Sequence, residues 1–196
     1  LNPVDKFSEV VIWDDVNLIE AYVNATYRSI PQELQQEPLS TACDETYCIH
    51  NWGNPWVMLR GELNQDNVGS IMGNINLWGG AYKNIHKINV YFEKIENSAI
   101  DEDAKGHLTG EMKFLRAFIY SHLIWRYGGV PIITNTYELD DEFNATRTAY
   151  ADCVKFIVEE LDEAIKLLPD KQPESELGRA SADACRALKS RVLLYD

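Results

Sequence analysis

The strongest hydrophobic pattern in the chain lies in residues 110–134, GEMKFLRAFIYSHLIWRYGGVPIIT. Large apolar residues recur there at helical spacing, and further apolar residues occupy most of the other faces: Met112, Leu115, Phe118, Ile119, Leu123 and Trp125, with Phe114, Ala117, Tyr120 and Ile124. A helix that is apolar nearly all round is buried against neighbours on several sides. Gly128, Gly129 and Pro131 then supply the signals that end a helix. The pattern predicts a buried central helix over residues 103–127, followed by a short extended segment.

Four further stretches have the period of amphipathic helices, over residues 13–27, 75–97, 150–168 and 182–195. Asp14 and Asp15 stand at the start of the first, where the positive end of the helix dipole favours them. Thr148 and Ser181 are the expected N-caps of the third and fourth. In the second, Asn89 falls on the apolar face, so its amide needs hydrogen-bond partners in the interior.

The second stretch also contains Gly79 and Gly80, and each costs about 1 kcal/mol inside a helix relative to Ala. These glycines indicate either the close approach of a neighbouring backbone or a helix that begins later than residue 75. Trp13, Trp78 and Trp125 lie on predicted helices among apolar neighbours, so we expect them in the core.

The last four predicted helices form two pairs, each of two antiparallel helices joined by a turn. Two such pairs in series resemble a helical-repeat array of the tetratricopeptide kind. Residues 31–73 show almost no helical period and carry Trp52 and Trp56. An irregular segment of this length in a compact domain is usually functional or disordered, and its tryptophans argue against disorder. We predict an all-α fold of tetratricopeptide-like helix pairs with a long, irregular, aromatic-rich loop.

Charged residues on the predicted helices have structural interpretations. Arg116 and His122 lie on the buried helix, and we expect both to be satisfied structural residues. A buried guanidinium needs a carboxylate or carbonyl partner, which the sequence does not name. The charge run of the 150–168 helix is interpreted as a solvated face rather than a catalytic cluster: Glu159, Glu160, Asp162, Glu163 and Lys166.

The charge balance narrows the classes of partner. The chain has 18 Lys and Arg against 31 Asp and Glu, a net charge of 18 − 31 = −13. Such a balance argues against nucleic acid and anionic membrane surfaces and suits neutral or cationic ligands.

The cysteines suggest no cofactor. Cys43 and Cys48 lie in the irregular segment with His50 close behind, but no second pair stands at zinc-ligand spacing. A local disulfide between Cys43 and Cys48 is the other possibility, in an oxidising compartment. Cys153 and Cys185 are expected to be small core residues. We predict no metal and no cofactor.

The order of the motifs is similar to that of the SusD/RagB family of outer-membrane, glycan-binding lipoproteins. The similarity rests on residues 110–134, on EELDEAIKLLP (159–169) and on GRASADACRALKSRVLLYD (178–196). The family pattern has an LRAF-type helix ending in a YGG/D-VP turn, a helix ending in DEAI-x-LLP, and a GR-A helix ending in R-V-x-L-Y. Arg147 and Tyr150 fill the intermediate positions, and the opening helix and the 75–97 helix also match.

This resemblance implies a function that composition does not show. Family members bind oligosaccharides at the outer-membrane surface, are held there by an N-terminal lipid, and pass glycans to a TonB-dependent (SusC-like) transporter. They are not enzymes. The lipid-bearing cysteine is absent here, and the chain has less than half the usual family length. We therefore expect a single SusD-like N-terminal domain over residues 1–196, truncated at both ends.

A neutral sugar offers C–H faces that pack on aromatic rings and hydroxyls that need polar partners. The irregular segment holds the one cluster of suitable residues on a predicted loop, and it matches the family's N-terminal binding region in location: Trp52, Asn54, Trp56, Tyr47, Asn51 and Arg60. The alternative for the two tryptophans is that they plug the loop onto the helices.

Two other function classes remain. A helical-repeat adaptor without glycan binding would use the helix pairs as a peptide groove, and its acidic surface would favour basic peptides. A hydrolase would need paired carboxylates, such as Asp44 with Glu45 or Asp140 with Asp141, but no histidine or nucleophile is arranged near them. The aromatic loop favours the glycan-binding protein.

Overall fold

The computed structural model describes residues 12–30, 39–47, 49, 56–67, 76–137, 142 and 144–195, and these residues form helices and no strand. The α-helices are α2 (Val16–Tyr27), α3 (Trp56–Leu59), α4 (Trp78–Ile95), α5 (Glu102–Tyr127), α6 (Tyr150–Leu167) and α7 (Ala182–Leu194). Two short 3₁₀ helices, η1 (Leu39–Ala42) and η3 (Glu174–Glu176), lie in the connections. The predicted all-α fold is confirmed.

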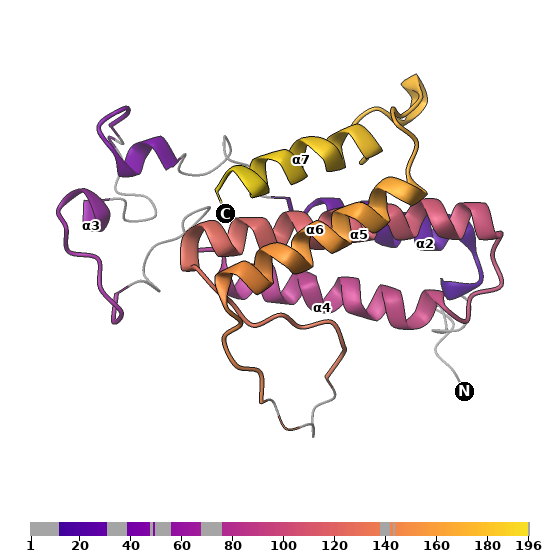
Figure 1. The fold of residues 1–196 in the computed structure, drawn as a ribbon, viewed down its shortest axis with the longest axis horizontal. Coiled ribbons are helices and arrows are strands. Elements are labelled where there is room, and N and C mark those ends of the chain that lie inside the picture. Colours follow the sequence, from indigo (N-terminus) through magenta and orange to yellow (C-terminus); the bar gives the residue numbers. More distant parts are fainter. Residues whose placement is uncertain are drawn as a thin grey trace.

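Helix α5 is the centre of the bundle, as the sequence pattern predicts. It packs against α4, α6 and α2, and α7 lies mainly on α6 (Figure 1). Leu115, Tyr120 and Leu123 on α5 are fully buried. Asp101 caps the first turn by accepting hydrogen bonds from the amides of residues 103 and 104. Gly128 ends the helix with φ of +69°, a conformation that glycine adopts without strain.

Gly129, the second glycine of the pair, is required by a close contact rather than by its backbone conformation. A Cβ on Gly129 would lie 2.1 Å from the carbonyl oxygen of Thr148, so only glycine fits there. The Thr148 amide donates to the Val130 carbonyl at 3.2 Å. Arg147 also donates from Nη1 to the carbonyl oxygens of Tyr127, at 2.9 Å, and Gly129. The end of α5 is thus bonded to the residues that precede α6.

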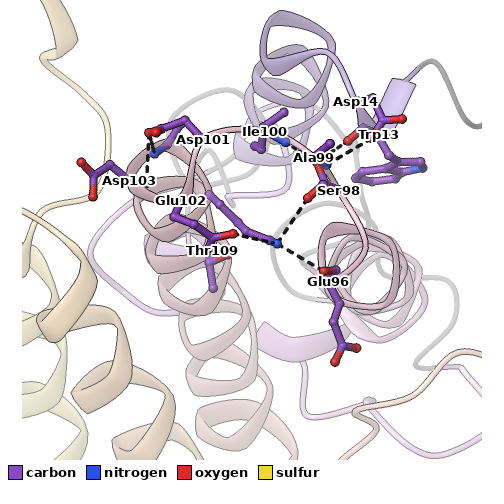
Figure 2. Close-up of polar contacts among 12 residues, drawn as sticks. Trp13, Asp14, Glu96, Ser98, Ala99, Ile100, Asp101, Glu102, Asp103 and Thr109 are labelled. Atoms are coloured by element: carbon purple, nitrogen blue, oxygen red, sulfur yellow. Dashed lines mark hydrogen bonds and ion pairs between the residues drawn. The ribbon is translucent and has the colours of Figure 1, made fainter.

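The turn between α4 and α5 is bonded to the start of the described chain (Figure 2). The Ser98 hydroxyl donates to the Trp13 carbonyl, and the Ala99 amide donates to Asp14 Oδ1 at 3.2 Å. Lys105 donates from Nζ to the Glu96 carbonyl at 3.2 Å. The contacts of Ser98 and Ala99 join segments 85 residues apart in sequence, whereas that of Lys105 lies within the turn. The indole of Trp13 is buried, as predicted.

A buried polar cluster joins α4, α5 and α6. Arg116 donates from Nε to Glu160 Oε2 at 2.7 Å and from Nη1 to Asn89 Oδ1 at 2.9 Å. The Asn89 amide in turn donates to the carbonyls of Ile133 and Asn135, each at 3.0 Å. Arg116 and Asn89 are therefore satisfied interior residues, as predicted. The prediction that Glu160 lies on a solvated face is wrong: its side chain is 8% exposed, because α5 brings Arg116 against that side of α6.

A second buried carboxylate holds the connection between α6 and α7. Glu111 is fully buried and accepts two hydrogen bonds of 2.7 Å from the guanidinium of Arg179. Arg179 also donates to Asn24 on α2 at 2.9 Å, and the Tyr27 hydroxyl accepts from the Ala180 amide at 2.8 Å. The connection is therefore bonded to two helices that precede it in the chain.

The helix termini agree with only some of the predicted caps. Ser181 caps α7 as predicted, and Asp15, expected only at the positive end of the dipole, also caps α2. The prediction for Thr148 is wrong, because Ala149 is the N-cap of α6 and the Thr148 hydroxyl accepts from the Ile132 amide instead. Helix α4 begins at Trp78, and no neighbouring atom of the described residues lies within 4 Å of a Cβ placed on Gly79 or Gly80. The helix therefore begins later than residue 75, and Gly79 and Gly80 lie in its first turn.

The cysteines are thiols wherever the structure describes them. Cys153 and Cys185 are buried, as predicted, and burial raises the pKa of both. Cys43 is exposed and free, with its sulfur 3.2 Å from the Ser40 carbonyl oxygen, so the alternative of a local disulfide is not borne out. Cys48 and His50 lie outside the described residues. None of the described helices combines the length and the apolar character needed to cross a bilayer.

Candidate functional site

The aromatic loop, residues 47–60, holds the site residues predicted from the sequence. Tyr47 and Trp56 form an edge-to-face pair with ring centroids 4.8 Å apart. The Tyr47 side chain is 71% exposed and Trp56 is half-buried. Within the described part of the chain, neither ring is among the core residues or the hydrophobic residues packed against the core. The pair therefore presents the Tyr47 ring to solvent, and the alternative in which Trp56 plugs the loop onto the helices stays open.

The local sequence explains how Trp56 is held. Residues 56–59 make the single helical turn α3, which packs against η1. The Arg60 amide donates to the Trp56 carbonyl at 2.9 Å, and Gly61 then turns the chain with φ of +67°. Val57 is the buried residue of this turn. Arg60 is exposed and lies one helical turn after Trp56.

The structure brings together two of the predicted site residues and leaves three untested. Tyr47 and Trp56 are in contact, and Arg60 follows on the same turn of chain. Trp52, Asn51 and Asn54 lie outside the described residues. Their assignment to the site remains a prediction.

Sequence analysis missed an exposed tryptophan outside the aromatic loop. Trp78, predicted to be a core residue, is 36% exposed at the first position of α4. Its ring is held by Tyr82, at 5.0 Å between centroids, and by Tyr127, at 5.2 Å. A groove of about 450 Å³ lies beside it, lined mostly by apolar and aromatic side chains: Trp78, Tyr82, Ile85, Ile133 and Tyr137, with His86. The sequence signal for this groove was the pair Gly79 and Gly80, because two residues without side chains leave part of the helix surface uncovered.

The described lining of the groove beside Trp78 contains no Asp, Glu, Lys or Arg side chain. The Tyr82 hydroxyl donates to the Pro131 carbonyl at 2.8 Å, and burial raises the pKa of Tyr82 well above its usual value. Its phenol therefore stays neutral. No group of three or more His, Cys, Asp or Glu side chains in the described part of the chain is placed to hold a metal ion. These aromatic surfaces are suited to binding a ligand rather than to acid–base chemistry.

Comparison with known proteins identifies the family. A family model described as starch-binding and associating with the outer membrane matches residues 4–194. The chain belongs to this SusD-like family. The SusD-like match covers the whole helical bundle and the aromatic loop, so the resemblance inferred from the motifs is confirmed.

Individual SusD-like relatives extend beyond this chain. A SusD-like protein from Bacteroides fragilis is 32% identical with a TM-score of 0.80, and the match covers 100% of this chain and 38% of that one. A laminarin-binding SusD-like protein shares the fold, with a TM-score of 0.79 at 24% identity, over 91% of this chain and 40% of its own. SusD-like protein P25 of Formosa agariphila is 28% identical over 120 residues, which are 61% of this chain and 23% of that protein. The chain therefore spans well under half the length of these relatives.

Proposed function

We propose that this SusD-like chain binds an oligosaccharide at the aromatic loop during carbohydrate uptake at the outer membrane. The observation that carries the proposal is the exposed Tyr47–Trp56 pair, which stands away from the hydrophobic core. A pair of exposed aromatic rings offers apolar surface that a ligand can bury. In a family described as starch-binding, a sugar ring is the ligand that this surface fits.

The chemistry of the loop suits a neutral sugar. The C–H face of a pyranose would pack on the exposed ring of Tyr47 or on the open side of Trp56. Arg60 would donate hydrogen bonds to hydroxyls or ring oxygens. We propose that Trp52 supplies a further ring and that Asn51 and Asn54 supply amides, which both donate and accept as hydroxyls require.

The remaining parts of the proposal concern the whole protein. We propose that the domain of residues 1–196 works without catalysis, beside a TonB-dependent, SusC-like transporter, on the extracellular face of the outer membrane. A lipid anchor outside this chain would hold it there. The family's association with the outer membrane supports this placement.

A glycan-array screen tests the site directly. The wild-type chain is expected to bind at least one neutral oligosaccharide, and Trp56→Ala, Tyr47→Ala and Trp52→Ala are each expected to weaken that binding without changing helix content by circular dichroism. Leu177→Ala is the matched control, because Leu177 is a large apolar residue 76% exposed in a different connection. Binding that survives all three aromatic substitutions would contradict the proposed site.

A helical-repeat adaptor is the second candidate, and the groove beside Trp78 is the observation that favours it. Its lining offers apolar contacts but few groups that could bond sugar hydroxyls. An adaptor would bind peptides, and Trp78→Ala would weaken that binding. A chain that binds no glycan but shows Trp78-dependent peptide binding would favour the adaptor.

A further inference from the structure

A second cavity, the arginine pocket, lies where α5, α6 and α7 meet. It has a volume of about 500 Å³, within the range of small-molecule sites, and is lined by charged and aromatic residues: His122, Trp125, Arg126, Tyr150, Arg191 and Tyr195. These residues come from the last turns of α5 and α7 and the first turn of α6. None of them belongs to the aromatic loop.

The pocket is lined by hydrogen-bond donors. Arg126 approaches His122 Nδ1 at 3.2 Å through Nη1 and donates to the His122 carbonyl at the same distance. A guanidinium can only donate, so Nδ1 is the acceptor and the neutral imidazole carries its proton on Nε2. The indole Nε1 of Trp125 is buried and has no hydrogen-bond acceptor within the described residues. An acceptor-only group, such as a carboxylate, is the complement of such a lining.

The local charge is positive although the chain is acidic. The guanidinium of Arg191 lies 4.7 Å from the Trp125 ring centroid and forms no ion pair with a carboxylate of the described chain. Burial, together with Arg126 and Arg191, lowers the pKa of His122 to about 4, so the imidazole is neutral at pH 7. The helix dipole favours a positive charge in the last turn of a helix, which explains why arginines occur at these positions. The dipole does not account for the unbonded indole N–H of Trp125.

The aromatic side chains of the pocket add a surface for a ring. Tyr195 is 61% exposed, and its ring centroid lies 6.4 Å from that of Trp125 in an edge-to-face arrangement. The Tyr150 hydroxyl donates to the Tyr195 carbonyl at 3.4 Å, which ties α6 to the end of α7. A ligand with both a carboxylate and a flat C–H face would use the arginines and the aromatic rings together.

We infer that the arginine pocket binds a saccharide unit that carries a carboxylate, that is, a uronic acid. The choice of a saccharide rests on the proposed function, whereas the choice of a carboxylate rests on the two guanidinium groups and the unbonded indole N–H that line the pocket. Figure 1 places the end of α7, the start of α4 and the segment with η1 and α3 toward the same end of the bundle. An acidic oligosaccharide would therefore bind on the side of the protein that carries the aromatic loop.

The net charge of −13 does not prevent this binding. At physiological ionic strength the interaction between charges is screened beyond about 8 Å, so most of the acidic surface acts weakly on a ligand in the pocket. The two guanidinium groups act at contact distance, where screening is slight. Higher salt should therefore weaken uronate binding only moderately.

Titration calorimetry with trigalacturonate tests the inference, with carboxyl-reduced trigalacturonate as the uncharged control ligand. We expect the charged trimer to bind at least about tenfold more tightly than the reduced one. Arg191→Gln should remove most of this preference, and Trp125→Phe, which keeps a ring but removes the N–H, should reduce it. Arg186→Gln is the matched control on the same helix, because Arg186 pairs with Asp170 and Asp183, each at 2.8 Å.

A spectroscopic readout separates binding in the pocket from a loss of folding. A carboxylate bound beside Arg126 and Arg191 should raise the pKa of His122 above about 4, which the NMR titration of its imidazole protons would report. No binding of trigalacturonate, equal binding of the reduced trimer, or binding unaffected by Arg191→Gln would each overturn the inference. Preference for a polyglutamate peptide over trigalacturonate would overturn the saccharide assignment.

The outcomes also distinguish this inference from the proposed function. Neutral glycan binding that depends on Trp56 but not on Arg191, with no uronate preference, would leave the proposed function standing and refute the arginine pocket. Uronate binding that depends on Arg191 but not on Trp56, with no neutral glycan bound, would support the pocket and refute the site in the aromatic loop.

Discussion

Replacing Arg116 with methionine should destabilise the fold by about 3 kcal/mol. The substitution keeps a long apolar side chain beside Phe92, whose ring centroid lies 4.3 Å from the guanidinium, but removes every donor. Glu160 would keep one partner, Lys113 at 3.1 Å, and Asn89 Oδ1 would lose its donor. Breaking a buried ion pair by removing one partner costs about 3–5 kcal/mol. Because Lys113 remains, we expect a loss at the lower end of that range.

Urea unfolding followed by circular dichroism at 222 nm measures this loss. A change of about 3 kcal/mol corresponds to a melting temperature about 6–12 °C lower for a domain of this size. Lys166→Met is the control, because its ion pair with Glu163 joins side chains that are 66% and 51% exposed. Exposed pairs contribute at most about 1 kcal/mol, so this variant should unfold almost as the wild type does.

A double substitution tests the physical reason. Arg116→Met combined with Glu160→Leu leaves neither buried ion, so it should be more stable than Arg116→Met alone. A deficit of about 1–3 kcal/mol should remain, because Asn89 Oδ1 still lacks its donor. The reasoning fails if Arg116→Met loses less than about 1 kcal/mol, or if the double variant is less stable than the single one.

Three further predictions concern the bundle. Leu115→Ala should lower the free energy of unfolding by about 2–5 kcal/mol, measured by urea titration, because Leu115 is fully buried; an unchanged melting temperature would contradict the central position of α5. Gly129→Ala should destabilise through the clash with the Thr148 carbonyl, whereas Gly80→Ala, in open space on a helix, should stabilise by up to about 1 kcal/mol; calorimetry should give opposite signs. The pKa of His122 is lowered from 6.5 to about 4, so the unfolded chain binds a proton between these pH values that the folded chain does not. Stability should therefore fall by up to about 3 kcal/mol as the pH drops through this window, and His122→Gln should remove that part of the melting-temperature slope.

The helices were predictable because their signals are local. The apolar positions of α5 and the caps at Asp15 and Ser181 can be read within a few residues of sequence. Glu160 could not be placed, because its burial depends on Arg116, which is 44 residues away and on another helix. A charge run is normally a solvated face, and only the packing of α5 on α6 shows which carboxylate turns inward.

The candidate site was less predictable for the same reason. Composition showed that the loop carries aromatic residues, and the structure confirms the contact of Tyr47 with Trp56. No period in the loop tells which rings face outward. Trp78 was predicted to be a core residue because its neighbours on the helix are apolar. It is the first residue of α4, however, and none of the described elements covers its ring. The arginine pocket is assembled from three helices, so no single stretch of sequence reveals it.

The bonds between the end of α5 and the start of α6 bear on how this scaffold can diversify. Thr136 still bonds to Glu93 on α4, and Arg147 and Thr148 bond back to Tyr127, Gly129 and Val130, so both ends of the connection are fixed to the bundle. For such a closed excursion, doubling the number of residues costs only about 0.6 kcal/mol in closure entropy. Insertions between residues 136 and 146 would then change the surface of the protein while leaving the helices in register. This connection is where the scaffold can gain new sequence at the least risk to folding.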